Sequence, residues 1–206
     1  HMLRLFINYR RQDSEGYAGR LYDHLLRHFE REQVFIDVDN IPAGADFVQA
    51  LEDAVADCDV LIALIGLQWL TIADDAGQRR LHQWNDFVRI EIASALRMGK
   101  FVVPVLVGGA SMPSPNDLPE DLVGLARRNA VALGHHSFAY DVDKLVAAIK
   151  DAVPANESFK PRPNSETLRR KDDALRGVRS DVINAVASPL YTCRVENGYF
   201  PVFGEG

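Results

Sequence analysis

The sequence predicts a doubly wound α/β fold of the flavodoxin-like type, and three observations carry this prediction. Apolar runs typical of buried strands alternate with segments of helical spacing over residues 1–153. The run Val60–Ile65 is apolar at every position, which indicates a strand that is buried on both faces, as in a parallel sheet covered by helices. The connections are short, and five strands suit the order 2-1-3-4-5, although the sequence alone does not prove that order.

The expected strands are short runs of apolar and β-branched residues. Pro104 lies inside the fourth run, and we expect a local irregularity there because proline has no backbone donor. In chain order the expected strands cover residues 3–9, 34–38, 60–65, 101–107 and 130–133.

The expected helices have apolar residues at every third or fourth position. Asp46 is a candidate N-terminal cap for the second helix, and Gly99 is a candidate stop for the third. In chain order the helices cover residues 15–32, 46–57, 85–98, a short segment after residue 119, and 141–153.

The chain beyond residue 153 has a different character. Residues 154–164 contain three prolines and are interpreted as a linker. Residues 165–206 combine a helical pattern with two apolar runs around Asn197-Gly198, which is a β-hairpin signal. Because a lone helix and hairpin bury little apolar surface, we expect an assembly element or the start of a truncated second domain.

Composition excludes several classes of partner. The net charge is −6, whereas nucleic-acid binding requires a basic surface. Cys58 and Cys193 are too few and too distant for a disulfide framework or a zinc site. No apolar run reaches the length of a membrane span. We therefore expect a cytoplasmic protein that binds neither nucleic acid nor membrane.

The common nucleotide and hydrolase motifs are absent. The chain has neither a G-x-G-x-x-G fingerprint nor a Walker A loop, and it has no G-x-S-x-G or H-E-x-x-H motif. His24 and His28 are spaced to share a metal ion on one helix face, but no further ligand accompanies them. We expect two surface histidines, and neither a metal nor a cofactor.

The third expected helix carries the most informative carboxylate. Glu91 lies three residues after Val88 and four before Ala95, on or beside the apolar stripe. A carboxylate there loses hydration, which is costly unless the group is paired or used. Phe87 lies one turn earlier and suits a flat base joined to a sugar. The alternative is a glutamate at the helix edge that reaches water.

Polar residues come directly after the first two expected strands. In open α/β sheets, ligands bind beyond the carboxyl ends of the strands. Asn8, Tyr9, Arg10 and Arg11 lie at the end of the first strand, and Asp37 lies at the end of the second. The two arginines suit a pyrophosphate, which accepts charge-assisted hydrogen bonds. The alternative is an ordinary solvated loop.

Four segments resemble the TIR domain family, named after the Toll and interleukin receptors. They occur in the family's order and at matching spacing, and the resemblance covers the expected domain but not the tail. The segments are residues 5–11, similar to its opening box; 35–44, similar to its BB loop; 64–66 with Trp69, similar to the segment after the third strand in bacterial members; and 86–92, similar to the helix with the catalytic glutamate.

The resemblance implies a flavodoxin-like fold and, as in many members, NAD+ glycohydrolase activity with NAD+ as substrate. It implies that Glu91 is catalytic, that Phe87 stacks on a ring, that Phe47 walls the site, and that Arg10 and Arg11 meet phosphates. NAD-cleaving relatives often have tryptophan where this chain has Phe87, so the stacking area is smaller.

The resemblance also implies activation by self-association, in which the BB loop of one copy completes the site of the next. The candidate loop residues are Ile41, Pro42, Ala43 and Gly44. A role in bacterial, antiphage defence signalling is implied as well, with a sensor domain or partner engaged through the tail. Two alternatives stay open: a scaffold that acts only through TIR–TIR contacts, and a nucleoside deoxyribosyltransferase, which shares the fold class and uses a glutamate.

Overall fold

The computed structural model describes residues 2–36 and 46–153. Some of the sequence-based expectations fall outside these ranges and stay predictions. They concern the linker at 154–164, the helix and hairpin at 165–206, Asp37, and the BB-loop residues Ile41, Pro42, Ala43 and Gly44.

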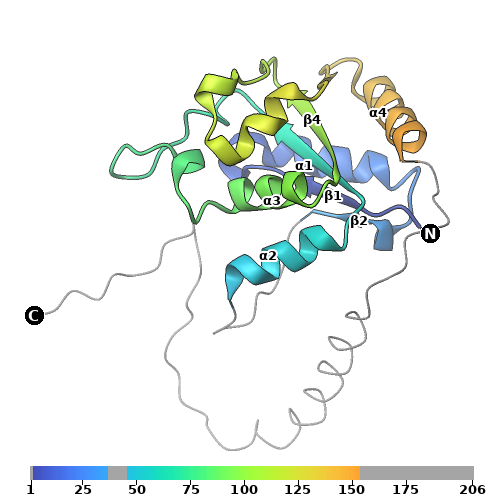
Figure 1. The fold of residues 1–206 in the computed structure, drawn as a ribbon. Helices are drawn as coiled ribbons and strands as arrows, with labels where there is room; N and C mark the ends of the chain where they lie inside the picture. Colours follow the sequence, from blue (N-terminus) through green and yellow to red (C-terminus); the bar gives the residue numbers. More distant parts are fainter. Residues whose placement is uncertain (1, 37–45, 154–206) are drawn as a thin grey trace, which may run out of the picture. The chain divides into compact units, whose positions relative to one another are not determined.

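The described residues form a five-stranded parallel sheet in the order β2-β1-β3-β4-β5 (Figure 1). This confirms the flavodoxin-like order expected from the sequence. The strands are β1 (Leu5–Asn8), β2 (Val34–Phe35), β3 (Val60–Ile65), β4 (Phe101–Val107) and β5 (Val131–Leu133).

In the part of the chain that the structure describes, four α-helices cover the two faces of the sheet (Figure 1). One apolar core lies between the sheet and helices α1 and α4, and a second lies between the sheet and helices α2 and α3. The bounds are α1 (Arg11–Leu25), α2 (Phe47–Ala56), α3 (Phe87–Arg97) and α4 (Phe138–Ala152).

Strands β3 and β4 match the sequence-based bounds, whereas β1 is shorter than the expected residues 3–9. All six side chains of β3 are buried, as its unbroken apolar run predicted. The expected irregularity at Pro104 was wrong, because β4 pairs with β3 without interruption and Pro104 lies opposite Ala63. Pairing with β5 begins at Val105, so Pro104 needs no partner on that side.

The helix expected over residues 15–32 is shorter and starts earlier. Ser14 has non-helical dihedral angles (φ −140°, ψ 18°), which separate a first turn at Arg11 from the continuous helix that ends at Leu25. Residues Arg31–Gln33 form a separate 3₁₀ turn, η1, in which the Gln33 side chain accepts a hydrogen bond from the Glu30 backbone at 2.9 Å. This local capping competes with continuation of the helix.

Three further 3₁₀ segments complete the described fold. They are η2 (Arg80–His82), η3 (Pro115–Asp117) and η4 (Glu120–Arg127). Segment η4 replaces the short helix expected after residue 119, and η3 lies within the proline-rich stretch before it. Within residues 2–36 and 46–153, no helix has the length and apolar character that crossing a membrane requires.

Candidate active site

Helix α3 begins at the edge of the sheet where β1 ends. Asp86 caps the helix, because its Oδ1 accepts a hydrogen bond from the backbone N–H of Arg89 at 3.0 Å. Gly99, at φ +67°, comes after the last turn and confirms the expected stop. The helix that carries Glu91 is therefore defined at both ends by residue types that the local sequence supplies.

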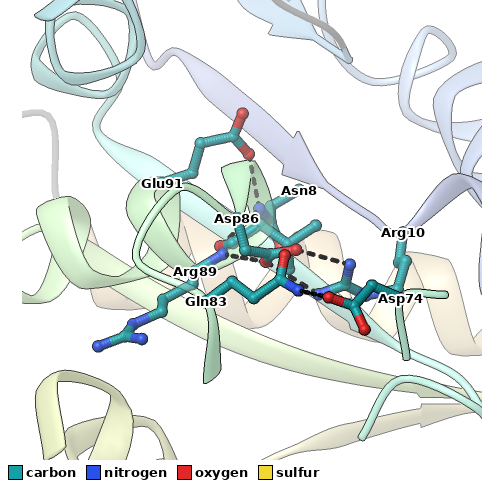
Figure 2. A network of polar contacts seen from close by, with 8 residues as sticks. Asn8, Arg10, Asp74, Gln83, Asp86, Arg89 and Glu91 are labelled. Carbon is teal, nitrogen blue, oxygen red and sulfur yellow. Dashed lines mark hydrogen bonds and ion pairs between the residues drawn. The ribbon is translucent and has the colours of Figure 1, made fainter. Parts of the chain in front are cut away.

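Glu91 is buried on this helix, with 9% of its surface exposed. Asn8, the last residue of β1, is 1% exposed and donates from Nδ2 to Glu91 Oε2 at 2.6 Å (Figure 2). The same nitrogen donates to the Val88 carbonyl oxygen at 3.3 Å. Asn8 therefore fixes the position of the Glu91 carboxylate at the end of β1.

Arg10 lies next to this pair and is engaged with Asp86. Its Nη1 and Nη2 donate to the two Asp86 carboxylate oxygens at 2.8 and 2.9 Å (Figure 2). The exposed fractions of the two side chains are 5% and 3%. A bidentate pair of this kind is geometrically specific. We call Asn8, Arg10, Asp86 and Glu91 the polar clamp, because together they join the end of β1 to the start of α3.

The two neighbouring arginines differ in environment. The sequence predicts phosphate contacts for both, yet the Arg10 guanidinium is buried against Asp86, whereas the Arg11 side chain is 67% exposed. The Nε atom of Arg11 lies 4.0 Å from Oε1 of Glu15, one turn along α1. Of the two, Arg11 is placed to meet an anion from solvent.

Tyr9 is not brought to the clamp. It is half-buried and packs against the core beneath α1 and α4, on the face of the sheet opposite α3. Consecutive residues of an extended chain point to opposite faces, so Asn8 and Tyr9 face different layers. The substrate contact assigned to Tyr9 stays a prediction.

Three aromatic side chains lie beside the start of α3. The Phe47 ring, on the first residue of α2, lies 5.4 Å from the Phe87 ring and 6.5 Å from the Trp84 ring, measured between centroids. Phe87 is 46% exposed and Trp84 is 74% exposed. We call Phe47, Trp84 and Phe87 the aromatic rim. Phe47 and Phe87, which the sequence analysis assigned separately to the substrate site, therefore lie next to each other.

Asp86 and Trp84 belong to the site but were not identified from the sequence. Asp86 carries a local signal, because an aspartate directly before an apolar helical stripe is a typical cap. Trp84 carries a weaker signal, since it lies three residues before Phe87 in a segment with no regular pattern. Neither the pairing of Asp86 with Arg10 nor the contact of Trp84 with Phe47 can be deduced from spacing.

The loops around the clamp are tied together by Asp13. Its carboxylate accepts hydrogen bonds from the backbone N–H groups of Gly66 and Gln68, both at 2.8 Å. A Cβ at Gly66 would overlap the Asp13 carboxylate, so a larger residue here would displace Asp13 from these two hydrogen bonds. The first turn of α1 is thereby fixed to the end of β3, at the same edge of the sheet as Asn8.

Other reactive groups lie away from the clamp. Burial raises the pKa of the Cys58 thiol to about 12, so it is not a nucleophile at neutral pH. Burial also lowers the pKa of His24, whose ring packs against Phe138. The Nε2 atom of His28 lies 2.9 Å from Oδ1 of Asp143. In the described ranges, no group of three or more His, Cys, Asp or Glu side chains is placed to hold a metal ion.

Comparison with known proteins places the chain in a family. A family model described as the TIR domain matches residues 5–146. NAD(+) hydrolase sarm1 of Drosophila melanogaster is 30% identical over 172 residues, which cover 76% of this chain and 12% of that protein. NAD(+) hydrolase SARM1 of Danio rerio is 30% identical over 156 residues, which cover 74% of this chain and 20% of that protein. The chain thus spans a small part of the length of the curated relatives it matches.

The TIR domains in a structure of the activated Roq1 resistosome, which directly recognizes the pathogen effector XopQ, share the fold. The TM-score is 0.52 at 12% sequence identity, and the match covers 71% of this chain and 99% of that chain. The family match spans the sheet, the polar clamp and the aromatic rim together. The chain therefore belongs to the TIR domain family.

Proposed function

We propose that this TIR domain cleaves the bond between nicotinamide and ribose in NAD+, with Glu91 as the catalytic residue. The observation that carries the proposal is the buried Glu91 carboxylate, which Asn8 holds at the edge of the sheet beside exposed aromatic rings. The names of the two curated relatives, both NAD(+) hydrolases, support the same reaction.

The chemistry requires stabilisation of positive charge. When the glycosidic bond breaks, its electron pair stays on the nicotinamide nitrogen and the ribose carbon becomes cationic, as in glycoside hydrolysis. Nicotinamide leaves as a neutral molecule, so no general acid is needed. The negative charge of Glu91 stabilises the developing cation, and its carboxylate accepts a hydrogen bond from a ribose hydroxyl.

The product depends on which nucleophile captures the ribose carbon. Water adds its oxygen to that carbon and loses a proton, which gives ADP-ribose. Capture by an adenine nitrogen or a ribose hydroxyl closes a ring and gives a cyclic ADP-ribose. In both cases one bond to the ribose carbon breaks and one forms, so no oxidant or reductant is involved.

The remaining residues take three roles in this proposal. Asn8 positions Glu91 through their hydrogen bond, and Arg10 positions it by holding Asp86, which caps the helix that carries Glu91. Arg11 binds the phosphates, with Tyr9 and Asp37 as further substrate contacts at the ends of the first two strands. Phe47 and Phe87 hold a planar ring of the substrate.

The proposal extends to assembly and biology. We infer that self-association through Ile41-Pro42-Ala43-Gly44 activates the enzyme, in the manner of the family it belongs to. Residues 1–153 form the TIR domain and residues 154–164 a linker. Residues 165–206 assist assembly or lead to a sensor. The proposed setting is bacterial antiphage defence in the cytoplasm, where free thiols such as Cys58 persist.

A non-enzymatic scaffold is the second candidate. The hydrogen bond from Asn8 to Glu91 favours it, because such a bond also serves a purely structural role between β1 and α3. Turnover of NAD+ distinguishes the two candidates.

The test is chromatography of NAD+ incubated with the full chain, dilute and concentrated. We expect nicotinamide release that rises steeply with protein concentration. Glu91→Gln keeps the size of the side chain and an acceptor for Asn8, and should lower the rate at least about 100-fold. Glu32→Gln is the matched control, since this exposed residue lies in η1, before β2, at the opposite edge of the sheet.

Two outcomes count against the proposal. NAD+ consumption by Glu91→Gln at the wild-type rate would remove Glu91 from the mechanism. No consumption by the concentrated wild-type chain, with the fold intact by circular dichroism, would favour the scaffold.

A further inference from the structure

Trp84 lies in solvent although the chain around it is fixed. Its side chain is 74% exposed, and an exposed indole leaves a large apolar surface in contact with water. The preceding residue, Gln83, donates from Nε2 to Asp74 Oδ2 at 2.5 Å (Figure 2). Asp86, two residues after Trp84, is held by its ion pair with Arg10 (Figure 2). The exposure therefore belongs to an anchored turn and not to a frayed segment.

The anchoring extends to the start of the turn. Arg89 Nη1 donates to the carbonyl oxygen of His82 at 3.0 Å, and Leu81 is 1% exposed. The backbone on both sides of Trp84 is thus tied to α3 and to the core. A residue presented in this way is pre-organised for contact with a partner, because little conformational freedom is lost on binding.

The neighbours of Trp84 indicate the chemistry of that partner. The Phe47 ring contacts both of the other rings, with interplanar angles of 44° to Trp84 and 30° to Phe87. These three residues form an aromatic surface that is partly open to solvent and adjoins the helix turn of Glu91. Planar heteroaromatic rings stack on such surfaces, and a positively charged ring gains further from the negative π-face of an indole.

We propose that Trp84 is a substrate-binding residue that stacks on a planar ring of the dinucleotide, together with Phe87. It supplies aromatic area that Phe87 alone lacks, and its indole suits the pyridinium ring or the adenine ring. The inference rests on the proposed function for the identity of the ligand, but the aromatic surface itself does not.

Intrinsic fluorescence tests the assignment directly. The chain has two tryptophans, and the other, Trp69, is 1% exposed. We would use the full chain with Glu91→Gln to prevent turnover, and titrate it with nicotinamide mononucleotide and, separately, with AMP. The expected result is a saturable change in Trp84 emission with one of the two probes, which identifies the ring, and loss of that change in the Trp84→Phe background.

Calorimetric titration of the same probes gives the affinity without the fluorophore. Trp84→Ala should raise the Kd roughly tenfold, and Trp84→Phe should raise it less. Tyr140→Ala is the matched control, since Tyr140 is an exposed aromatic residue on α4, beyond the opposite face of the sheet. The Kd of the Tyr140→Ala variant for each probe should equal that of the chain with Glu91→Gln alone.

All variants are compared at a protein concentration where sedimentation velocity gives them the same association state. An unchanged Kd in Trp84→Ala, or no Trp84-dependent signal with either probe, overturns the proposal. Weaker self-association with an unchanged Kd also overturns it and assigns Trp84 to a protein contact.

The two proposals fail separately. Probe binding that depends on Trp84, in a wild-type chain that releases no nicotinamide, would sink the proposed reaction and leave the aromatic site intact. Nicotinamide release together with probe binding that does not depend on Trp84 would support the proposed reaction and overturn the assignment of Trp84.

Discussion

The polar clamp and the aromatic rim lie next to each other at one edge of the sheet, yet they are built in opposite ways. The clamp joins pairs of residues that are separated by 76 and 83 positions in the chain, and its side chains are buried and paired with one another. The rim presents two exposed rings, Trp84 and Phe87, to solvent. The clamp side chains are already held by hydrogen bonds in the free protein, whereas the rim has surface that a ligand can still cover.

The polar clamp is therefore suited to orienting a catalytic group, and the aromatic rim is suited to binding a ligand. A charged group that acts on a transition state is most effective when its position is fixed beforehand, because no reorganisation is then needed during the reaction. A stacking surface has no such requirement and is best left open. Substitutions in the clamp should therefore affect stability and turnover together, and substitutions in the rim should affect ligand affinity alone.

The largest effect on stability is expected from breaking the buried ion pair. Arg10→Met leaves Asp86 charged and without its bidentate partner, which should cost about 3–5 kcal/mol and lower Tm by roughly 10 °C. Arg11→Met removes the exposed neighbour and should change stability by no more than about 0.5 kcal/mol. Thermal and urea unfolding of the full chain measure both.

The paired replacement Arg10→Met with Asp86→Leu sharpens this test. It removes both charges and should recover most of the stability, except about 1 kcal/mol for the lost helix cap. Equal destabilisation by Arg10→Met and Arg11→Met would show that the buried ion pair contributes no more to the free energy of unfolding than an exposed arginine does. In kinetic assays, Arg10→Met should lower kcat and Arg11→Met should raise KM.

A smaller effect is expected from Asn8→Asp, which keeps the shape of the side chain. The variant loses the hydrogen bond to Glu91 and places two carboxyl groups side by side, at a cost of about 1.5–3 kcal/mol at neutral pH. Two carboxylates this close share a proton in the folded state, so the folded chain binds more protons than the unfolded chain. The deficit relative to wild type should therefore grow as pH rises from about 5 to about 7.5.

Unfolding of both proteins across that pH range checks the sign. A deficit that is constant with pH would mean that the new carboxyl group does not meet Glu91, and the geometry of the clamp would be wrong. Turnover should fall with stability, since Glu91 loses the donor that orients it.

The smallest effect is expected in the rim. Phe87→Trp enlarges the stacking surface and should tighten binding of the planar ring a few-fold, with stability unchanged within about 0.5 kcal/mol. The matched control is Tyr140→Trp on α4. Destabilisation of several kcal/mol by Phe87→Trp would show that the rim is packed core and would remove the contrast with the clamp.

The central sheet and most helix boundaries could be predicted because their signals are local. The apolar run of β3 and the stop at Gly99 each reside within one segment of the chain. Asp46 likewise caps α2, accepting hydrogen bonds from Val48 and Gln49 at 3.0 and 3.3 Å. The helix end expected at residue 32 was wrong, because α1 ends at Leu25 and Glu30 and Gln33 form a competing local turn.

The candidate site could be predicted only in part. Glu91 stood out because an acidic residue on an apolar stripe is conspicuous within a single helix, and its catalytic role was assigned from the resemblance to the TIR family. Arg10 and Arg11 looked equivalent in the sequence, and Asn8 and Tyr9 likewise. Nothing within their own segment shows which of each pair faces α3.

Local sequence signals were sufficient for the α/β class, the central strands and the helix that carries Glu91, because periodicity, breakers and caps act over a few residues. Only packing between distant segments decided that Arg10 is buried against Asp86, that Asn8 rather than Tyr9 meets Glu91, and that Trp84 joins Phe47 and Phe87. The physical reason is that burial and ion pairing depend on which distant segment packs against a residue, and packing of α3 on β1 is a property of the whole sheet.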